Sequence, residues 1–218
     1  MRSRTLGGLI TIGLVSLFLI SSPGCVRLAA NLVNAIQGNE QPAEYNGFEK
    51  KRVAIVCATD KGLSSDASAA LLTGYVHMLL NKNIKEIELV RAEEVQRWLD
   101  AYGTIESDYV QIGKGVKADQ VLAIDLAGMK IKDGATLYRG QCDITVTVFD
   151  IADEGAIVFK KQFPEFSFPK MGGPTTSDTT DAKFRNMFLT VVAAKVSGLF
   201  YPVDPTAEYA LDATANSF

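Results

Sequence analysis

The sequence is poor in histidine and in clustered positive charge, and each shortage excludes a class of function. His77 is the only histidine among 218 residues, so any Ser-His-Asp or Cys-His mechanism would have to use it. No cysteine or second histidine lies at metal-ligand spacing from it, so no zinc site is expected. We expect His77 to be an exposed surface residue of a helix. The net charge is −3 and no basic run occurs, which argues against a nucleic-acid partner.

A phosphate-binding loop is also missing. Lys114 lies between Gly113 and Gly115, but the motif needs a further glycine five residues before Gly113 and a Ser or Thr after the lysine. Asp108 occupies the first of these positions and Gly115 the second. We therefore expect no nucleotide cofactor, and the sequence indicates no other cofactor and no metal site.

Long apolar runs are scarce as well. The run from Leu6 to Ile20 is shorter than the roughly 20 residues that cross a bilayer comfortably. It is preceded by Arg2 and Arg4 and followed by small residues that end in Gly24. A basic start, a short apolar centre and a small-residue end are typical of a secretory signal peptide. We therefore predict a signal peptide over residues 1–24.

Gly24 and Cys25 resemble the end of a bacterial lipoprotein signal, in which a small residue precedes an acylated cysteine. The family usually has Leu three residues and Ala or Ser two residues before the cysteine, whereas Ser22 and Pro23 stand here. The resemblance implies that Cys25 is the lipid attachment site and that acyl chains such as palmitate hold the protein to a membrane, facing the periplasm. Val26, rather than Asp, favours the outer membrane over the inner by the same resemblance.

Two alternatives to lipidation stay open. Ser22 and Gly24 also satisfy the small-x-small rule of ordinary signal peptidase, which would release a soluble protein. The other alternative is an uncleaved N-terminal anchor. Two of the three possibilities attach the chain to a membrane, and we favour the lipoprotein.

Composition divides the rest of the chain into three parts. Residues 25–50 combine Cys25 with a short apolar stripe and a loop rich in Pro, Gly, Asn and Glu, which predicts a tether. Residues 51–203 hold the strand and helix patterns and predict one α/β domain. The small, polar residues 204–218 predict a frayed, flexible tail.

The first half of the domain alternates strands and helices. An apolar, β-branched run over residues 52–58 predicts a strand covered on both faces. Ser64, Ser65 and Asp66 are N-cap candidates for a helix that ends near Asn81. A short strand and two helices follow, over residues 85–90, 93–101 and 107–116.

The second half is predicted to be an antiparallel meander. From Asp119 the hydrophobic period changes to two, which predicts three strands, over residues 120–132, 136–151 and 156–163. Turn signals at residues 133–134 and 153–155 join them as hairpins. A Pro/Gly/Ser/Thr-rich loop over 164–180 and a closing helix over 181–200 complete the domain. The predicted order is β-α-β-α-α-β-β-β-α, a single α/β (α+β) domain with a largely antiparallel C-terminal part.

This order, behind a lipoprotein-like signal, resembles the small α/β domain shared by the N-terminal part of TolB and the curli-secretion lipoprotein CsgG. The supporting features are the opening strand Arg52–Val56, the step from Gly115 to Leu122 into a strand, and the hairpin through Asp133-Gly134. The likeness spans roughly residues 50–200. It implies a periplasm-facing structural or assembly role without catalysis. The chain is shorter than CsgG and has no clear extra pair of membrane-spanning hairpins, so a pore is not implied.

Carboxylates are the remaining candidates for catalysis. Asp119 and Asp125 lie on or beside one predicted strand and Asp143 on its hairpin partner, and a carboxylate pair supports general acid–base chemistry. Asp125 has apolar neighbours, among which a charge is costly unless it is paired. We favour a structural role, because structural pairing perturbs carboxylates as readily as catalysis does. Its candidate partners are Lys130, Arg139 and Lys160.

Two further sets of residues leave alternatives open. Cys57 and Cys142 form either one disulfide, which the periplasm permits, or two buried thiols. We favour buried thiols, since a bridge requires Cα atoms within about 7 Å. The loop phenylalanines either form an exposed patch for a partner or plug the open end of the core, and we favour the plug; they are Phe163, Phe166 and Phe168.

Three classes of function remain. The first is a non-catalytic cell-envelope lipoprotein that presents its domain for assembly with an envelope protein or a second copy, or as an accessory to secretion or transport. The second is a periplasmic small-molecule or glycan-binding module, which needs a concave pocket with convergent polar groups. The third is a carboxylate-dependent hydrolase, which needs two carboxylates about 5–10 Å apart in a cleft. We favour the first, because nucleophile, metal and cofactor signatures are missing.

Overall fold

The structure is a computed structural model, and it describes residues 40–60, 62–63, 66–102 and 108–204. The chain divides into two compact units, Met1–Glu40 and Gln41–Phe218, and all the described helices and strands belong to the second. The predicted signal peptide, Cys25, most of the tether and all but the first residue of the predicted tail lie outside the described residues. Those expectations therefore stay predictions.

The elements follow the predicted order, with one addition. They are β1 (Arg52–Thr59), β2 (Gly62–Leu63), α3 (Ala67–Asn83), β3 (Glu88–Leu89), α4 (Ala92–Tyr102), α5 (Tyr109–Gly115), β4 (Gln120–Asp133), β5 (Leu137–Asp150), β6 (Ala156–Phe168) and α6 (Asp181–Ser197). The addition is β2, which is too short to show a hydrophobic period. The predicted mixed α/β class is confirmed.

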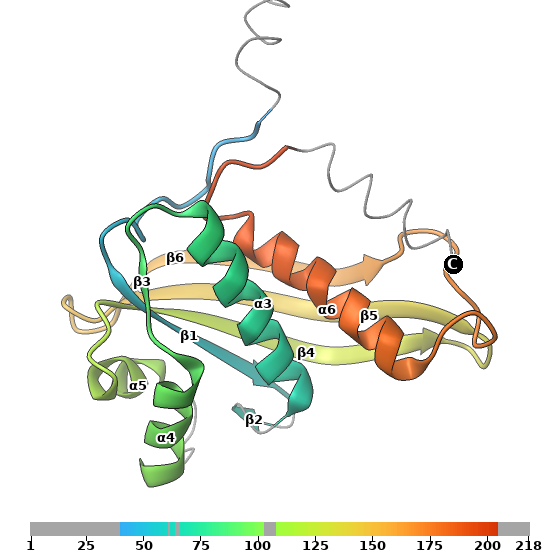
Figure 1. The fold of residues 1–218 in the computed structure, drawn as a ribbon, viewed down its shortest axis with the longest axis horizontal. Coiled ribbons are helices and arrows are strands. Elements are labelled where there is room, and N and C mark those ends of the chain that lie inside the picture. Colours follow the sequence, from blue (N-terminus) through green and yellow to red (C-terminus); the bar gives the residue numbers. More distant parts are fainter. Residues whose placement is uncertain (1–39, 61, 64–65, 103–107, 205–218) are drawn as a thin grey trace, which may run out of the picture. The chain divides into compact units, whose positions relative to one another are not determined.

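The strands form one sheet in the order β2-β1-β4-β5-β6, with β3 also paired to β1 (Figure 1). β1 is parallel to both β3 and β4, since helices connect these strands and return the chain to the same end of the sheet. β4, β5 and β6 are antiparallel, because short turns join them. Gly134 has φ +72° and Gly155 φ +86°, the left-handed conformation that such turns need.

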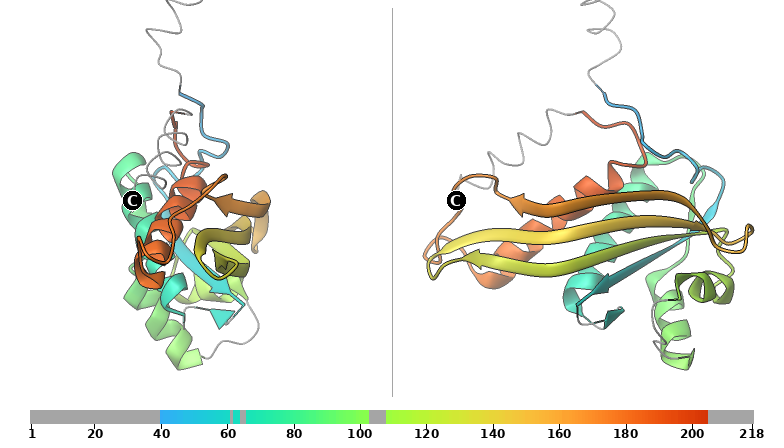
Figure 2. Two further views of the ribbon diagram at one scale, coloured as in Figure 1. Left: turned by 90° about the vertical axis from the view of Figure 1, so that its right-hand side faces the viewer. Right: turned by 180° about the vertical axis from the view of Figure 1, so that it is seen from behind.

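Helices cover the two faces of this sheet unequally. α3 and α6 lie side by side across one face, whereas α4 and α5 lie at one end of the other (Figures 1 and 2). Under α3 and α6 is the larger core, which contains Phe184 and Phe188 with apolar residues of every long strand. The smaller core joins α4 and α5 to β1 and the start of β4, through residues such as Leu99 and Ile112.

Local hydrogen bonds explain where three helices begin. Asp66, one of the predicted caps, accepts from the backbone N–H of Ser68 at the start of α3 (3.3 Å). Asp108 caps α5 and Thr180 caps α6 through the same kind of bond. Each side chain satisfies a backbone donor that has no partner within the first turn of a helix.

Two strand predictions had the wrong length. β3 covers two residues instead of six, because it pairs only with Arg52 and Val53 at the start of β1. β6 runs five residues beyond its predicted end at Phe163. Pro164 was expected to begin a loop, but β6 is an edge strand, in which the missing N–H of a proline is tolerated. The ladder shifts register opposite this point, between Cys142 and Ile144.

Candidate functional site

Asp125, the most unusual of the candidate carboxylates, is partnered by a tyrosine. It lies on the same face of β4 as Val121 and Ala123, and it accepts a hydrogen bond from the Tyr109 hydroxyl at the start of α5. Burial is the main cause that raises the pKa of Tyr109, and the bond to Asp125 adds to it. The prediction that Lys130, Arg139 or Lys160 is the partner of Asp125 is therefore wrong. Nothing local in the sequence links Tyr109 to Asp125, since the contact depends on α5 packing against β4.

The other two candidate carboxylates bind backbone groups. Asp119 Oδ2 accepts from the N–H of Arg52 at 2.7 Å, and Asp143 Oδ1 accepts from the N–H of Glu165 at 2.7 Å. Both side chains are exposed. Asp119 lies about 20 Å along the chain direction from Asp125, at ~3.3 Å per strand residue. Asp125 and Asp143 occupy diagonal positions on one face of the sheet, because Asp125 is opposite Thr145.

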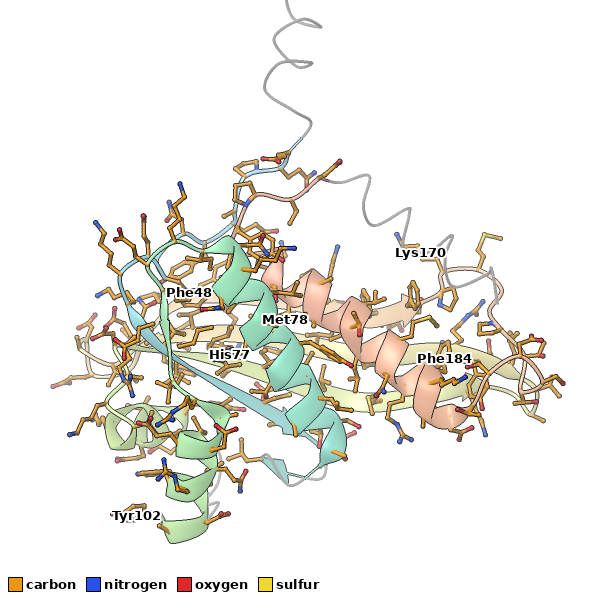
Figure 3. All side chains as sticks on the ribbon, in the orientation of Figure 1. Phe48, His77, Met78, Tyr102, Lys170 and Phe184 are labelled. Carbon is orange, nitrogen blue, oxygen red and sulfur yellow. The ribbon has the colours of Figure 1, made fainter. Side chains whose placement is uncertain are left out.

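The remaining polar candidates are dispersed. His77 lies at one side of α3 and is partly rather than fully exposed (Figure 3). Lys114 is exposed in the last turn of α5. Among the described residues, no three His, Cys, Asp or Glu side chains are grouped closely enough to hold a metal ion.

Cys57 and Cys142 are free and buried, so the favoured interpretation as buried thiols is confirmed. Cys57 on β1 is opposite Ile124 on β4, which is opposite Val146 on β5. Cys142 is therefore two strands away from Cys57, about 10 Å, and four residues further along. This exceeds the ~7 Å limit for a disulfide. Burial raises the pKa of Cys142 to about 12.

The three phenylalanines of the predicted loop belong to β6 and point into the larger core. Phe168 is buried in it, and Phe163 and Phe166 are partly buried against it. Phe166 lies beside Phe188 of α6, with ring centroids 6.2 Å apart. The prediction that these phenylalanines pack against the core is confirmed, although they belong to a strand and not to a loop.

A pocket that the sequence did not predict lies where the chain enters the domain. Its volume is about 380 Å³, and we call it the tether-end pocket. Three separate segments line it: Pro42, Ala43, Asn46, Phe48 and Glu49; Asn83, Ile84 and Lys85; and Phe200, Tyr201 and Pro202. Sequence reasoning missed it because only the fold brings these segments together.

Backbone hydrogen bonds fix the first wall of this pocket. Gln41 and Val203 exchange two N–H···O bonds of 2.8 and 3.0 Å, and the N–H of Tyr45 donates to the carbonyl of Leu199 at 3.0 Å. Gln41 and Tyr45, which belong to the last part of the predicted tether (residues 25–50), are thus hydrogen-bonded to the chain after α6. Lys161 of β6 adds an ion pair to Glu44 at 2.8 Å.

Aromatic rings form the floor of the tether-end pocket. Phe48 and Phe200 are both buried, with ring centroids 4.6 Å apart, and Figure 3 shows Phe48 beside the C-terminal end of α3. Tyr45 lies edge-on to Phe48 at 5.3 Å. Its pKa is raised mainly by burial. Aromatic pairs at such distances stabilise the floor of the pocket.

The rim of the pocket is polar and carries both signs of charge. Glu49 and Lys85 both line it and are exposed. Their chain neighbours, Lys50 and Glu86, form an ion pair of 3.5 Å that joins the two rim segments. None of the candidate carboxylates lines this pocket.

None of the helices in the described part of the chain combines the length and apolar character needed to cross a membrane.

Comparisons with known proteins show weak structural likeness and no sequence family. No protein-family model matches the chain, and no curated protein matches it. The fold is similar to lipoprotein GNA1162 from Neisseria meningitidis, with 10% identity, a TM-score of 0.44, and 67% of this chain and 98% of that chain covered. It is also similar to the PelC dodecamer from Paraburkholderia phytofirmans, with 14% identity, a TM-score of 0.41, and 74% and 94% covered.

A third similar structure is the LpoB C-terminal domain from Salmonella enterica, with 13% identity, a TM-score of 0.37, and 53% of this chain and 82% of that chain covered. At these TM-scores and identities the likenesses carry no conclusion about function. The resemblance to TolB and CsgG stays a prediction.

Proposed function

We propose that this protein is a cell-envelope lipoprotein, attached through Cys25, whose domain serves assembly with an envelope protein or with a second copy rather than catalysis. The predicted signal at residues 1–24 supports export, and the resemblance of Gly24-Cys25 to a lipoprotein signal supports acylation. Two or more acyl chains bind a bilayer stably, since each buried methylene contributes about 0.8 kcal/mol.

The observation that carries the non-catalytic part is the use of the three candidate carboxylates. Asp119 and Asp143 accept hydrogen bonds from backbone N–H groups, and Asp125 accepts one from Tyr109. All three bonds connect neighbouring elements of the domain. A general acid or base instead needs a carboxylate within reach of a substrate, and the tether-end pocket contains none of these three.

The entry of the chain into the domain supports a role close to the membrane. The segment Gln41–Phe48 is bound to the chain after α6. From Cys25 to Glu40 the chain has 15 residue steps, which span at most about 54 Å when fully extended. A domain held in this way stays within reach of partners that are themselves in or near the membrane.

A small-molecule-binding role is the second candidate, and the tether-end pocket is the observation that favours it. Its volume of about 380 Å³ lies at the low end of the ~300–1,000 Å³ typical of ligand sites. The two roles are compatible, because a ligand at this end of the domain leaves the part of the sheet that α4 and α5 do not cover available to a partner.

The test of the proposal is the intact mass of the membrane-extracted protein, wild type beside Cys25→Ala. We expect a mature wild-type chain that starts at Cys25 with added acyl mass, and loss of that mass in the variant. Cys142→Ala is the matched control, since its buried thiol is not an acylation site, and it should keep the lipid. An unmodified chain that starts at Cys25, or one that retains Met1, would contradict the lipoprotein assignment.

The assembly part needs its own measurement. Amine cross-linking in intact membranes should give products at multiples of the chain mass for self-assembly, or one distinct product for an envelope partner. Exclusively monomeric protein under these conditions, together with cleavage of a substrate by the purified chain, would contradict a non-catalytic assembly role.

A further inference from the structure

We propose that the tether-end pocket binds the head group of a zwitterionic phospholipid, such as phosphatidylethanolamine, from the membrane to which the protein is attached. This inference rests on the proposed function for one point only, the nearness of a bilayer. The charges, the shape and the location of the pocket each point to this ligand.

The two charges of the rim suit a ligand with both signs of charge. Among the described residues, neither Glu49 nor Lys85 has an ion pair, although both line the pocket. The Lys50–Glu86 pair beside them, at 3.5 Å, links the two segments that carry them. A lysine ammonium binds phosphate as a point charge, and a carboxylate accepts hydrogen bonds from a primary ammonium group. Phosphoethanolamine offers one group to each.

The floor and walls suit the part of a lipid just below its head group. Phe48, Phe200 and Ile84 give the pocket an apolar base, and Pro42 and Pro202 give it apolar sides. The amide of Asn46, for which the described residues provide no hydrogen-bond partner, can donate to a phosphate or ester oxygen. A volume of about 380 Å³ accommodates a head group, the glycerol and the first methylenes of the acyl chains rather than whole acyl chains.

The location favours a membrane lipid over a soluble ligand. The pocket is lined by Pro42 and Ala43, which belong to the predicted tether (residues 25–50). With Cys25 acylated, no more than about 60 Å of extended chain separates this wall from the bilayer. A purely anionic lipid such as phosphatidylglycerol is disfavoured. Glu49 would repel its negative charge, and the lipid offers no ammonium group from which Glu49 could accept a hydrogen bond.

The test uses the full chain with Cys25→Ala, so that an acyl anchor does not contribute to binding. Dihexanoyl-phosphatidylethanolamine, below its micelle concentration, is titrated while amide NMR shifts are followed. We expect saturable shifts confined to the three segments of the pocket. Lys85→Glu and Glu49→Lys should each weaken binding about tenfold, the loss of one charge-assisted hydrogen bond. Lys160→Glu, an exposed lysine on β6 outside the pocket, is the matched control and should bind like the parent chain.

Three results would overturn the proposal. The first is an affinity for dihexanoyl-phosphatidylglycerol equal to that for dihexanoyl-phosphatidylethanolamine. The second is an equal affinity for free glycerophosphoethanolamine, which would assign a soluble ligand. The third is unchanged binding in both the Lys85→Glu and the Glu49→Lys variants. Shifts without saturation count against it too. Because the titration does not depend on acylation, its failure is distinct from a failure of the mass measurement at Cys25.

Discussion

The two faces of the sheet are formed by the same strands but are buried very differently. One face lies under α3 and α6 along most of its length, and its core includes phenylalanines from α6 and β6. The other is covered only where α4 and α5 pack on β1 and the start of β4, and that core is mostly smaller aliphatic residues. Figure 2 shows the long hairpin of β4 and β5 extending beyond this cover.

The burial of residues along β4 shows the same difference in cover within a single strand. Its first half, Gln120–Leu126, is buried on both faces except at Asp125, whereas Ala127–Asp133 is largely exposed. Two covered faces favour a continuous apolar run, and one covered face favours alternation. The charged residues of β4 accordingly begin where α4 and α5 no longer cover the strand. Asp125 lies at this boundary, where Tyr109 supplies its hydrogen bond.

The largest expected effect comes from a substitution in the larger core, on the face of the sheet that α3 and α6 cover. Phe188 of α6 is fully buried and packs on Gly140 of β5, where an added Cβ would lie 2.1 Å from its ring. Phe188→Ala leaves a cavity that Gly140 cannot fill, so we expect a loss of about 3–5 kcal/mol in the free energy of unfolding. Urea denaturation measures it. Met78→Ala, at an exposed position on α3, should change stability by less than about 0.5 kcal/mol.

A loss below about 1 kcal/mol for Phe188→Ala would mean that the two faces do not differ in energy as their burial indicates.

A smaller effect is expected from a substitution in the smaller core, on the face that α4 and α5 cover in part. Tyr109→Phe keeps the ring that stacks on Phe149, with centroids 5.7 Å apart, and removes the donor to Asp125. We expect a loss of about 1–2 kcal/mol, less than for a fully buried carboxylate because Asp125 is partly exposed and water can replace the tyrosine. Tyr102→Phe, at an exposed hydroxyl on α4, is the control. An unchanged midpoint in Tyr109→Phe would show that the hydrogen bond contributes nothing.

The smallest expected effect concerns alkaline pH. Cys142 lies in the larger core, and burial raises its pKa from 9.0 to about 12. Above pH 9 the unfolded thiol ionises while the folded one stays protonated, so this contribution to stability is present below pH 9 and is lost as pH rises toward 12. By pH 10 the loss is about 1 kcal/mol.

Cys142→Ala should therefore have a shallower fall in stability between pH 8 and 10 than the wild type, measured by urea midpoints at each pH. Its lower stability at pH 7, from the smaller side chain, is a separate offset and does not affect the slope. Parallel curves for the two proteins would show that the thiol is accessible to water.

Local patterns predicted most of the fold. The alternation in β5 correctly assigned Cys142, Ile144, Val146 and Val148 to one buried face. It did not predict that Thr147, on the other face, is also buried, because that depends on the cover above it. The closing helix ends at Ser197 instead of residue 200, a difference typical of helix ends.

The sequence by itself determined the order of elements, the meander of the second half and a start of α3 at one of the cap candidates Ser64, Ser65 and Asp66, because hydrophobic period, turn residues and caps act within a few residues. It also contains the predicted signal peptide over residues 1–24, which Cys25 follows. The tertiary structure alone decided the partner of Asp125, the extension of β6 past Pro164, the separation of Cys57 from Cys142 and the tether-end pocket. Each of these depends on contacts between segments far apart in the chain, which are set by how helices and strands pack rather than by any local pattern.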